Sequence, residues 1–342
     1  MPTRVADRHI TRIRPLISPF VLAEEISANE DDEAQVAEHR RTLERILDGE
    51  DKRKFVVVGP CSVHDPDAAL AYAEKLRPAV APLADKLFLV MRVYFEKPRT
   101  VVGWKGLIND PGLDGSHQIN RGLRLARKLM LDITRLGLPT GTEFLDTTFG
   151  QYYADLVSWG AIGARTVESQ VHRELASGLS MPVGLKNRTD GNVQVAVDGI
   201  RSAAHRHLFP TLTREGAPAI FETGGNPYCH LILRGGNVSG PNFSGKAIEE
   251  AATVLRKHDL PENLVVDCSH GNSEKDHTRQ VDVLRQLAED NHPAVRGVMM
   301  ESHLVAGRQD LGENLTYGQS ITDACLGFEE TIEALQQYHD AI

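Results

Sequence analysis

Cysteine is scarce in this chain of 342 residues, with four in all. Cys61, Cys229, Cys268 and Cys325 lie far apart, and none of them forms a C-x-x-C pair. This spacing excludes the dense disulfide framework of small secreted domains and the short ligand pairs of zinc fingers. So few thiols in so long a chain are typical of reduced cysteines, and we expect a cytoplasmic protein.

Long apolar runs and a surplus of positive charge are also missing. No apolar stretch approaches the ~18–20 residues that span a bilayer, and the first residues lack the basic-then-apolar layout of a signal peptide. The chain has 38 Lys and Arg against 47 Asp and Glu, a formal net charge of -9. Nucleic acids and membranes select clustered positive charge, so we expect neither as a partner, whereas small anionic substrates respond to local charge.

Internal repeats and low-complexity tracts are absent too, and the composition suits a packed core. Hydrophobic residues make up 41% of the chain and charged residues 25%. The length fits two domains or one α/β barrel of about 250 residues with extensions. Residues 1–50 differ from the rest, with an extended piece at 10–21, an acidic turn at 30–33 and an amphipathic helix at 32–47 that ends at Gly49. We expect this extension to precede a catalytic unit at residues 51–342.

From Phe55 onward, short apolar segments alternate with longer segments of helical periodicity. Strands are predicted at residues 55–58, 87–93, 138–142, 161–164, 182–185, 231–233, 264–266 and 298–300. Helices are predicted at residues 68–76, 116–136, 150–159, 169–178, 192–206, 245–257, 274–290 and 323–338. Alternating units whose strands are apolar on both faces indicate a buried parallel sheet, and eight units favour a closed (β/α)8 TIM barrel over an open sheet. Residues 209–222 interrupt the alternation and predict an inserted β-hairpin.

Each predicted strand runs into a polar or reactive residue at its C-terminal end. In chain order these are Cys61, Arg92, Glu143, Arg165, Lys186, Arg234, Asp267 with His270, and Glu301. A barrel brings all of these ends to one face, where barrel active sites lie. We therefore expect the residues to converge although they are scattered in the sequence.

Cations dominate this set, because Lys97 and Arg99 follow the second strand. Two cations about 4 Å apart repel by about 4 kcal/mol at an effective dielectric near 20, so the cluster calls for anionic ligands. Arginine forks suit phosphate and carboxylate groups. The alternative is that these cations are ordinary salt-bridge residues at loop starts.

Cys61, His270, Glu301 and Asp323 form a second candidate group. A thiolate, an imidazole and two carboxylates suit a divalent ion such as Mn2+, Fe2+, Co2+ or Zn2+. Their spacing matches no short metal motif. Cys61 could instead be a small buried hydrophobe, His270 a hydrogen-bonding loop residue and Asp323 the N-cap of the last helix.

Eight motifs follow one another along the chain. They are VGPCS at residues 58–62, RVYFEKPRT at 92–100 with GWKG at 103–106, GART at 163–166, GLKN at 184–187, LRGG at 233–236, DCSH at 267–270, MES at 300–302 and SITDAC at 320–325. Together they resemble type I 3-deoxy-D-arabino-heptulosonate-7-phosphate (DAHP) synthases of the subclass with an N-terminal extension. The likeness covers nearly the whole chain, and the block from Lys97 to Gly106 is very specific.

The resemblance implies the first step of the shikimate pathway, in which phosphoenolpyruvate and erythrose 4-phosphate give DAHP and phosphate. It implies that Cys61, His270, Glu301 and Asp323 bind the divalent metal. For the two substrates it implies binding by Arg92, Lys97, Pro98, Arg99, Thr100, Ala164, Arg165, Lys186 and Arg234. For catalysis it points to Lys97, Cys61 and Glu143, and leaves open whether Lys97 or a metal-bound water protonates the new alkoxide.

In the same subclass the extension accompanies oligomerisation, as a homodimer or homotetramer, and feedback inhibition by an aromatic amino acid. The resemblance places an inhibitor pocket at Asp7, Gln151, Leu175, Leu179, Ser180, Phe209 and Thr211. The alternative is that the extension only caps the barrel or covers a dimer face.

Two other functions stay open. One is a related phosphoenolpyruvate-condensing synthase with a five-carbon sugar phosphate, against which the Lys97–Thr100 block and the extension argue. The other is an inactive barrel that senses amino acids, against which the complete set of candidate ligands argues.

Overall fold

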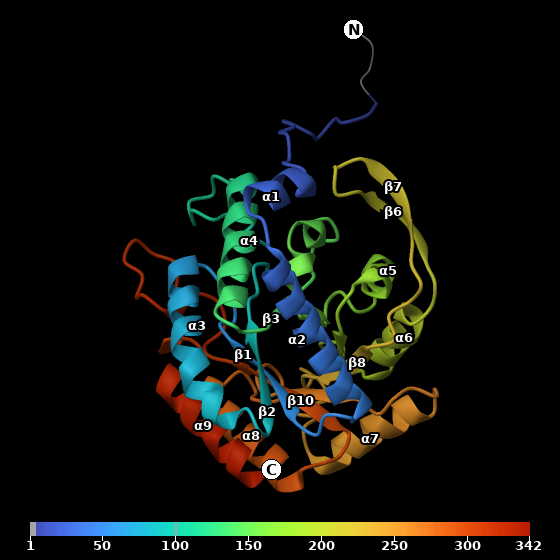
Figure 1. The fold of residues 1–342 in the computed structure, drawn as a ribbon, viewed down its shortest axis with the longest axis vertical. Coiled ribbons are helices and arrows are strands. Elements are labelled where there is room, and N and C mark those ends of the chain that lie inside the picture. The colour runs from blue at the N-terminus through green and yellow to red at the C-terminus, as the bar shows by residue number, and fades with distance from the viewer. Residues whose placement is uncertain (1–4, 100) are drawn as a thin grey trace.

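The computed structural model describes residues 5–99 and 101–342 and contains a closed barrel of parallel strands (Figure 1). Its strands are β1 (Lys54–Gly59), β2 (Leu87–Arg92), β3 (Thr140–Glu143), β4 (Trp159–Ile162), β5 (Val183–Lys186), β8 (Cys229–Leu233), β9 (Leu264–Asp267) and β10 (Val295–Glu301). They neighbour one another in the order β1-β2-β3-β4-β5-β8-β9-β10, and β10 closes onto β1. The predicted (β/α)8 barrel is confirmed.

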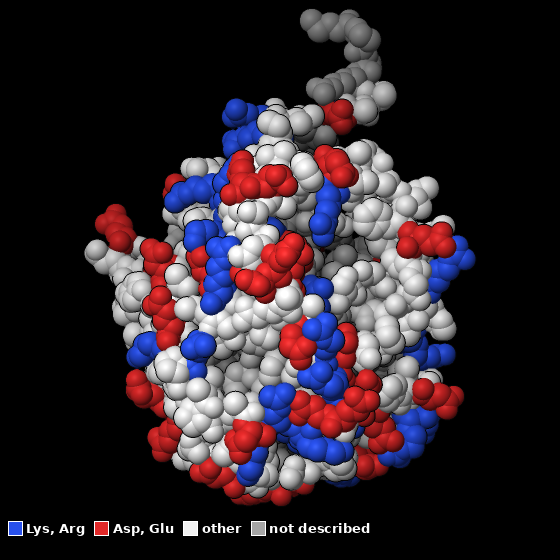
Figure 2. Space-filling model, viewed as in Figure 1, with Lys and Arg blue, Asp and Glu red and all other residues white. Residues whose placement is uncertain are grey.

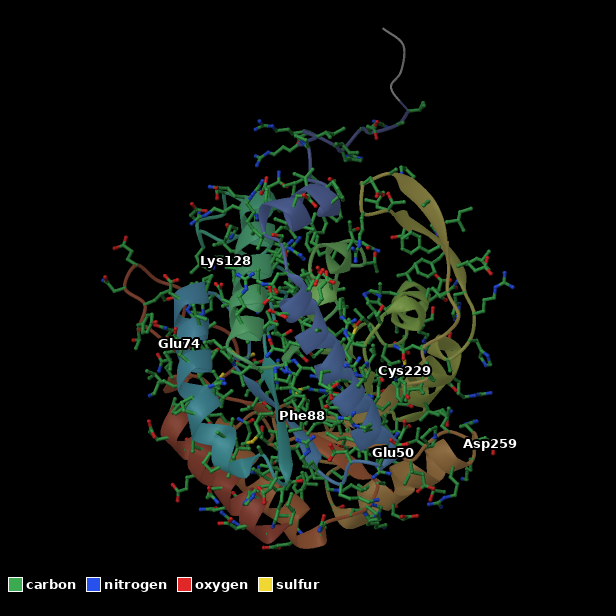
Figure 3. The ribbon with its side chains drawn as sticks, viewed as in Figure 1. Glu50, Glu74, Phe88, Lys128, Cys229 and Asp259 are labelled. Carbon is green, nitrogen blue, oxygen red and sulfur yellow. The ribbon has the colours of Figure 1, made fainter. Side chains whose placement is uncertain are left out.

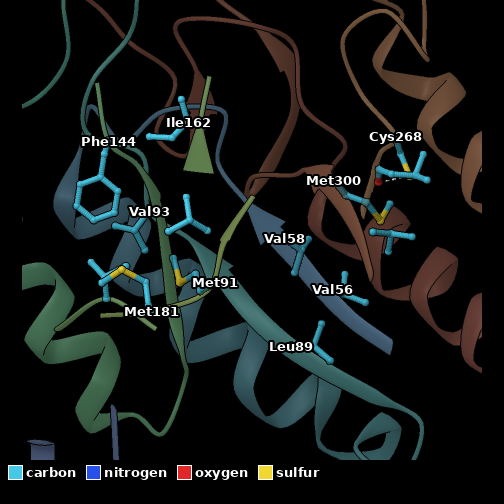
Figure 4. Packing of buried hydrophobic residues seen from close by; sticks show 14 of the residues in the cluster. Val56, Val58, Leu89, Met91, Val93, Phe144, Ile162, Met181, Cys268 and Met300 are labelled. Carbon is cyan, nitrogen blue, oxygen red and sulfur yellow. Dashed lines mark hydrogen bonds between the residues drawn. The ribbon is translucent and has the colours of Figure 1, made fainter. Parts of the chain in front are cut away.

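Helices surround the barrel and cover the outer faces of its strands (Figure 1). They are α3 (Pro66–Val80), α4 (Ile119–Arg135), α5 (Gln170–Gly178), α6 (Gln194–Ala203), α7 (Gly245–Arg256), α8 (Gln280–Asp290) and α9 (Phe328–Ala341), with a 3-10 turn, η1 (Ala81–Leu83), after α3. Figure 4 shows the apolar layer between strands and helices, where Val56, Leu89, Met91 and Met300 pack together. These positions alternate along their strands with positions that face the barrel interior.

The α-helix predicted at residues 150–159 is wrong. Two 3-10 turns, η2 (Phe149–Tyr152) and η3 (Ala154–Leu156), stand in its place. Arg40 donates to the carbonyl oxygens of Ala154 and Val157, and Arg127 donates to that of Tyr152. These carbonyls therefore accept hydrogen bonds from arginines of two other helices and not from the backbone amides of an α-helix.

Two other helices, the last two in the chain, begin at least five residues later than predicted. The last helix starts at Phe328 with Gly327 as its N-cap, so Asp323 is a loop residue and not the cap. In the loop after β9, Glu274 and Lys275 have φ angles of 52° and 68°. A left-handed backbone cannot continue a helix, so residues 274–276 stay in the loop, and a 3-10 turn, η4 (His277–Arg279), leads into α8.

The N-terminal extension contains two helices, α1 (Pro19–Glu25) and α2 (Glu30–Asp48). The expected extended piece is shorter than residues 10–21, because Ser18 caps α1, and residues 5–18 form no strand. The acidic residues 30–33 are the first turn of α2, where they favour the helix dipole. Gly49 ends α2 in the left-handed conformation, as predicted.

Helix α2 closes the N-terminal end of the barrel. Leu43, Ile46 and Leu47 join one apolar cluster with the inward side chains of the strands. The strand side of this cluster consists of Phe55, Val57, Val90, Trp159, Ala161, Ile232, Val265 and Met299. Figure 3 shows Phe88, at the start of β2, beside α2, and its ring lies 6.2 Å from that of His39. The extension is thus partly built into the barrel core.

The predicted hairpin is confirmed as β6 (Leu208–Leu212) paired antiparallel with β7 (Pro218–Glu222). Its inner face carries Phe209 and Phe221, whose rings lie 6.3 Å apart. Its outer face exposes Leu208 and Ile220. The tip reaches α1, where the Phe20 amide donates to the Arg214 carbonyl at 2.7 Å.

Charges of both signs are mixed over the face that α2 crosses (Figure 2), without a basic patch of the kind that nucleic acids select. Among the described residues, no helix has the length and apolar character needed to cross a membrane.

We predict that Leu43→Ala lowers the free energy of unfolding by about 2–5 kcal/mol, because it leaves a cavity between α2 and the barrel. Urea denaturation measures the change. Arg41→Ala is the matched control, since Arg41 lies on the exposed side of the same helix and pairs with Glu38; it should cost less than about 0.5 kcal/mol. A loss below about 1 kcal/mol for Leu43→Ala would show that α2 is not part of the core.

Candidate active site

A cavity of about 420 Å³ opens at the C-terminal ends of the barrel strands. The inward positions below it are mainly apolar, with the buried His230 among them, and the last inward position of several strands is polar. The cavity is lined by the predicted site residues Arg92, Lys97, Pro98, Arg99, Glu143, Ala164, Arg165, Lys186, Arg234, His270 and Asp323. Thr100 lies outside the described residues.

Arg92 and Glu301 form a fully buried ion pair at the floor of this cavity. The Arg92 Nη2 and Glu301 Oε1 atoms are 2.9 Å apart, and the side chains are 1% and 0% exposed. Arg92 also donates to the carbonyl oxygens of Pro60 and Cys61 and contacts the Met299 sulfur. Four of the five guanidinium N–H groups are therefore used within the protein. One N–H group of Arg92 is left for the substrate-binding role predicted for this residue.

Three of the four predicted metal ligands gather around one point, and the fourth, His270, lies beside Glu301. Ligand atoms of Cys61, Glu301 and Asp323 lie within 4.8 Å of one another. His270 stands slightly apart, with Nε2 at 3.9 Å from Glu301 Oε1. A thiolate, an imidazole and two carboxylates at this spacing fit a divalent transition-metal ion.

The backbone of His270 has an unfavourable conformation, and a neighbouring carboxylate contacts its ring. Its φ angle is 55°, an uncommon value for a residue other than glycine. Its Nδ1 lies 2.9 Å from Asp267 Oδ2 and has no other polar partner in the described part of the chain. A carboxylate behind a ligating imidazole orients the ring, and Asp267 occupies this position.

Lys97 stands over the thiol of Cys61. Its Nζ lies 3.0 Å from Cys61 Sγ and 3.1 Å from the Cys61 carbonyl oxygen. Burial disfavours the charge of Lys97, but Cys61 and Glu301 outweigh burial and raise its pKa. Burial, and then Glu301, raise the pKa of Cys61 to about 11. An ion that binds the thiolate must therefore displace a proton.

The cavity wall formed by Arg165, Lys186 and Arg234 carries positive charge, and the protein neutralises only part of it. Lys186 pairs with the buried Asp267 at 3.1 Å. Arg165, exposed at the cavity mouth, makes no ion pair or hydrogen bond to another described residue. Among the described residues, the Arg234 guanidinium donates only to the Gly235 carbonyl, at 3.3 Å, and burial lowers its pKa. Two guanidinium groups are thus available to an anionic ligand.

The sequence prediction missed several residues that line the cavity. Tyr94 follows Arg92 by two positions and shares its inward face, so strand periodicity could have found it. Glu96 is buried, which raises its pKa to about 8, and it accepts a hydrogen bond from the Asp146 amide at 3.3 Å. Lys275 comes from the loop after β9, where no periodic signal exists, and Arg308 ends a short strand outside the barrel, β11 (Val305–Arg308), that was not predicted.

The predicted inhibitor-site residues occupy the side of the barrel near the hairpin and the extension. Phe209 and Thr211 lie on the half-buried face of β6, which packs against α5, the helix of Leu175. Leu179 and Ser180 follow α5, and Gln151 is in η2, which contacts α1. Asp7 lies in the segment that precedes α1. Their role stays a prediction.

Comparisons with known proteins connect this arrangement to one family. Residues 26–336 match the model of the DAHP synthetase I family. The Phe-sensitive phospho-2-dehydro-3-deoxyheptonate aldolase of Escherichia coli is 53% identical over 341 residues, which are 98% of this chain and 97% of that protein. The Trp-sensitive enzyme of Escherichia coli O157:H7 is 50% identical over 344 residues, 99% and 98% of the two chains. A solved structure of phospho-2-dehydro-3-deoxyheptonate aldolase from Francisella tularensis has a TM-score of 0.95 at 52% identity, covering 97% of this chain and 98% of that one.

We predict that Asp267→Asn weakens Mn2+ binding about 10- to 100-fold, because the His270 ring loses the carboxylate that orients it. Isothermal titration calorimetry on the folded variant measures the dissociation constant. Asp276→Asn is the control, since Asp276 is an exposed cap of η4 in the same loop, and it should leave Mn2+ binding unchanged. Equal affinities of the wild-type chain and Asp267→Asn would contradict this role.

Proposed function

Since the chain belongs to the DAHP synthetase I family, we propose that it condenses phosphoenolpyruvate with D-erythrose 4-phosphate to give DAHP and inorganic phosphate. The observation that carries this proposal is the composition of the cavity. Arg165 and Arg234 offer unneutralised charge on one side, and four metal-ligand candidates lie on the other. A site for two phosphorylated substrates and a cation needs both features.

Each phosphorylated substrate has its own group of candidate residues. We assign phosphoenolpyruvate to Arg165, Lys186 and Arg234, with the Ala164 backbone beside them. Pro98, Arg99 and Thr100 are assigned to the phosphate of erythrose 4-phosphate. Arg99 supports this assignment, because its Nε donates to the Trp104 carbonyl at 2.7 Å, which fixes the arm of the guanidinium at the cavity edge. Binding both substrates in one cavity converts a bimolecular encounter into a local reaction.

The residues that would hold a divalent ion are Cys61, His270, Glu301 and Asp323. Mn2+, Fe2+, Co2+ and Zn2+ all suit this mixed set of donors. When bound, such an ion supplies Lewis acidity to the carbonyl oxygen of the aldose.

Proton transfers fall to Lys97 and Glu143. Carbon C3 of phosphoenolpyruvate attacks the aldose carbonyl carbon, and Lys97 gives a proton to the alkoxide that forms. Its position beside Cys61 and its raised pKa support this assignment, because the ammonium is charged when the reaction begins. A water then adds to C2 and loses a proton to Glu143, whose carboxylate lines the cavity. The C–O bond to the phosphate breaks last: the C2 hydroxyl loses its proton and becomes the ketone carbonyl of DAHP, and inorganic phosphate leaves with that proton.

A direct assay tests the proposed reaction. Purified protein with Mn2+ and phosphoenolpyruvate should release phosphate and form DAHP with erythrose 4-phosphate, and not with a five-carbon aldose phosphate. Activity with the five-carbon substrate alone would indicate the related synthase. The absence of product with either, while an aromatic amino acid binds, would indicate a sensing barrel and would refute the proposal.

We also assign feedback control by an aromatic amino acid to the extension and the hairpin, in a homodimer or homotetramer. The two Escherichia coli relatives named above are sensitive to tryptophan and to phenylalanine. In this chain, the extension contacts both the hairpin and the turns that follow β3. The Tyr152 hydroxyl donates to the Ile17 carbonyl at 2.6 Å, and the Phe20 amide donates to the hairpin. The exposed apolar side chains of Ile10, Ile13 and Ile220 support a partner subunit.

We predict that deletion of residues 2–14 reduces inhibition by the effective amino acid at least about fivefold and preserves the uninhibited rate. The deletion ends before Pro15 and Ile17, which bond to Asn120 and Tyr152, and it leaves α2 in the core. Initial rates with phenylalanine, tyrosine and tryptophan measure the effect against the full chain. Inhibition that is unchanged by the deletion would refute a regulatory role of this segment.

A further inference from the structure

The hydroxyl of Tyr94 is a buried polar group without a partner. Tyr94 is 2% exposed and lines the cavity, and its hydroxyl has no hydrogen bond within the described residues. Leaving a buried donor unpaired costs free energy, so such a group is expected to meet a ligand or a water. The other partnerless buried hydroxyls, of Thr142 and Tyr153, do not line the cavity.

The structure fixes this hydroxyl in position. The Tyr94 ring lies over the Arg92 guanidinium, with 3.6 Å between the guanidinium carbon and the ring centroid. Arg92 is itself immobilised by Glu301, Met299 and two carbonyl oxygens. The Tyr94 backbone is tied to the loop after β1, because the Val63 amide donates to its carbonyl at 2.9 Å. A polar group held in place before binding loses little entropy when a ligand arrives.

Tyr94, two residues past the end of β2, presents a neutral polar group to a ligand in the cavity. Arg92 has one free N–H, and the aromatic ring covers its guanidinium. Burial raises the pKa of Tyr94 above its ordinary value. The hydroxyl is therefore protonated at neutral pH and can donate a hydrogen bond.

Barrel topology indicates which part of the substrate the hydroxyl meets. The phosphate candidates Arg165, Lys186 and Arg234 lie at the ends of β4, β5 and β8. Around the barrel, β4, β5 and β8 are two, three and four strands from β2, so Tyr94 lies on the side of the cavity away from Arg234. The hydrogen-bond acceptor of phosphoenolpyruvate that lies away from its phosphate is the carboxylate.

We propose that the Tyr94 hydroxyl donates a hydrogen bond to the carboxylate of phosphoenolpyruvate and is a substrate-binding group of this enzyme. The inference rests on the proposed function, because it takes phosphoenolpyruvate as the ligand. It adds to the cationic residues a neutral donor that recognises the acid end of the substrate.

Tyr94→Phe tests the proposal, because it removes the hydroxyl and keeps the ring over Arg92. Calorimetry of phosphoenolpyruvate binding to the Mn2+-loaded protein should show affinity at least about tenfold weaker, as expected for loss of a hydrogen bond to a charged group. Inhibition by inorganic phosphate, which fills only the phosphate subsite, should be unchanged. Tyr153→Phe is the matched control: that hydroxyl is also buried and partnerless, but its ring packs between Phe95 and Phe144 outside the cavity. Its phosphoenolpyruvate affinity should equal that of the wild type.

Two outcomes would overturn the proposal. Phosphoenolpyruvate affinity of Tyr94→Phe equal to that of the wild type would show that the hydroxyl does not contact this substrate. Equal weakening of phosphoenolpyruvate and inorganic phosphate would place Tyr94 at the phosphate instead. A wild-type protein that binds no phosphoenolpyruvate would refute the proposed function itself, so the two failures are distinguishable.

Discussion

The buried ion pair of Arg92 and Glu301 is the constraint on which the site depends. Removing water from two charges is costly, and loss of one partner from such a pair typically destabilises a protein by about 3–5 kcal/mol. The ion pair contributes to the geometry of the site, because the Arg92 guanidinium connects the ends of β1, β2 and β10. It fixes the Glu301 carboxylate and the Cys61 backbone, two of the four candidate metal ligands, and it supports the ring of Tyr94. The barrel below, closed by α2, provides the rigid floor for this pair.

Some charges at the cavity are neutralised by ion pairs within the protein, and others are available to a ligand. Arg92 with Glu301, and Lys186 with Asp267, neutralise each other inside the protein. Arg165 has no partner in the described part of the chain. Its charge therefore favours anionic ligands although the whole protein carries a formal net charge of -9. Two phosphorylated substrates meet that requirement, and a nucleic acid would need a basic surface that the visible face lacks.

Much of this architecture follows from the sequence, because parallel strands buried on both faces alternate regularly with helices. The convergence of Cys61 and Glu301 follows as well, since the last inward residues of barrel strands share one face. The helix prediction for residues 150–159 failed because the carbonyls of this segment accept hydrogen bonds from arginines that are distant in the sequence. Such tertiary contacts leave no signal in the hydrophobic periodicity. Tyr94 was missed for another reason: a tyrosine directly after an apolar strand is easily taken for part of the core. The roles of single residues came from the family resemblance and not from spacing.

The central claim is that Arg92 holds the metal ligands in position. Its most direct test is the dissociation constant of Mn2+ for Arg92→Lys, measured by calorimetry on folded protein. Lysine keeps the charge but cannot make the four contacts of the planar guanidinium. We expect Mn2+ binding to weaken about 10- to 100-fold, the usual consequence of losing a group that orients metal ligands. Mn2+ affinity equal to that of the wild type, with only phosphoenolpyruvate binding impaired, would contradict the account.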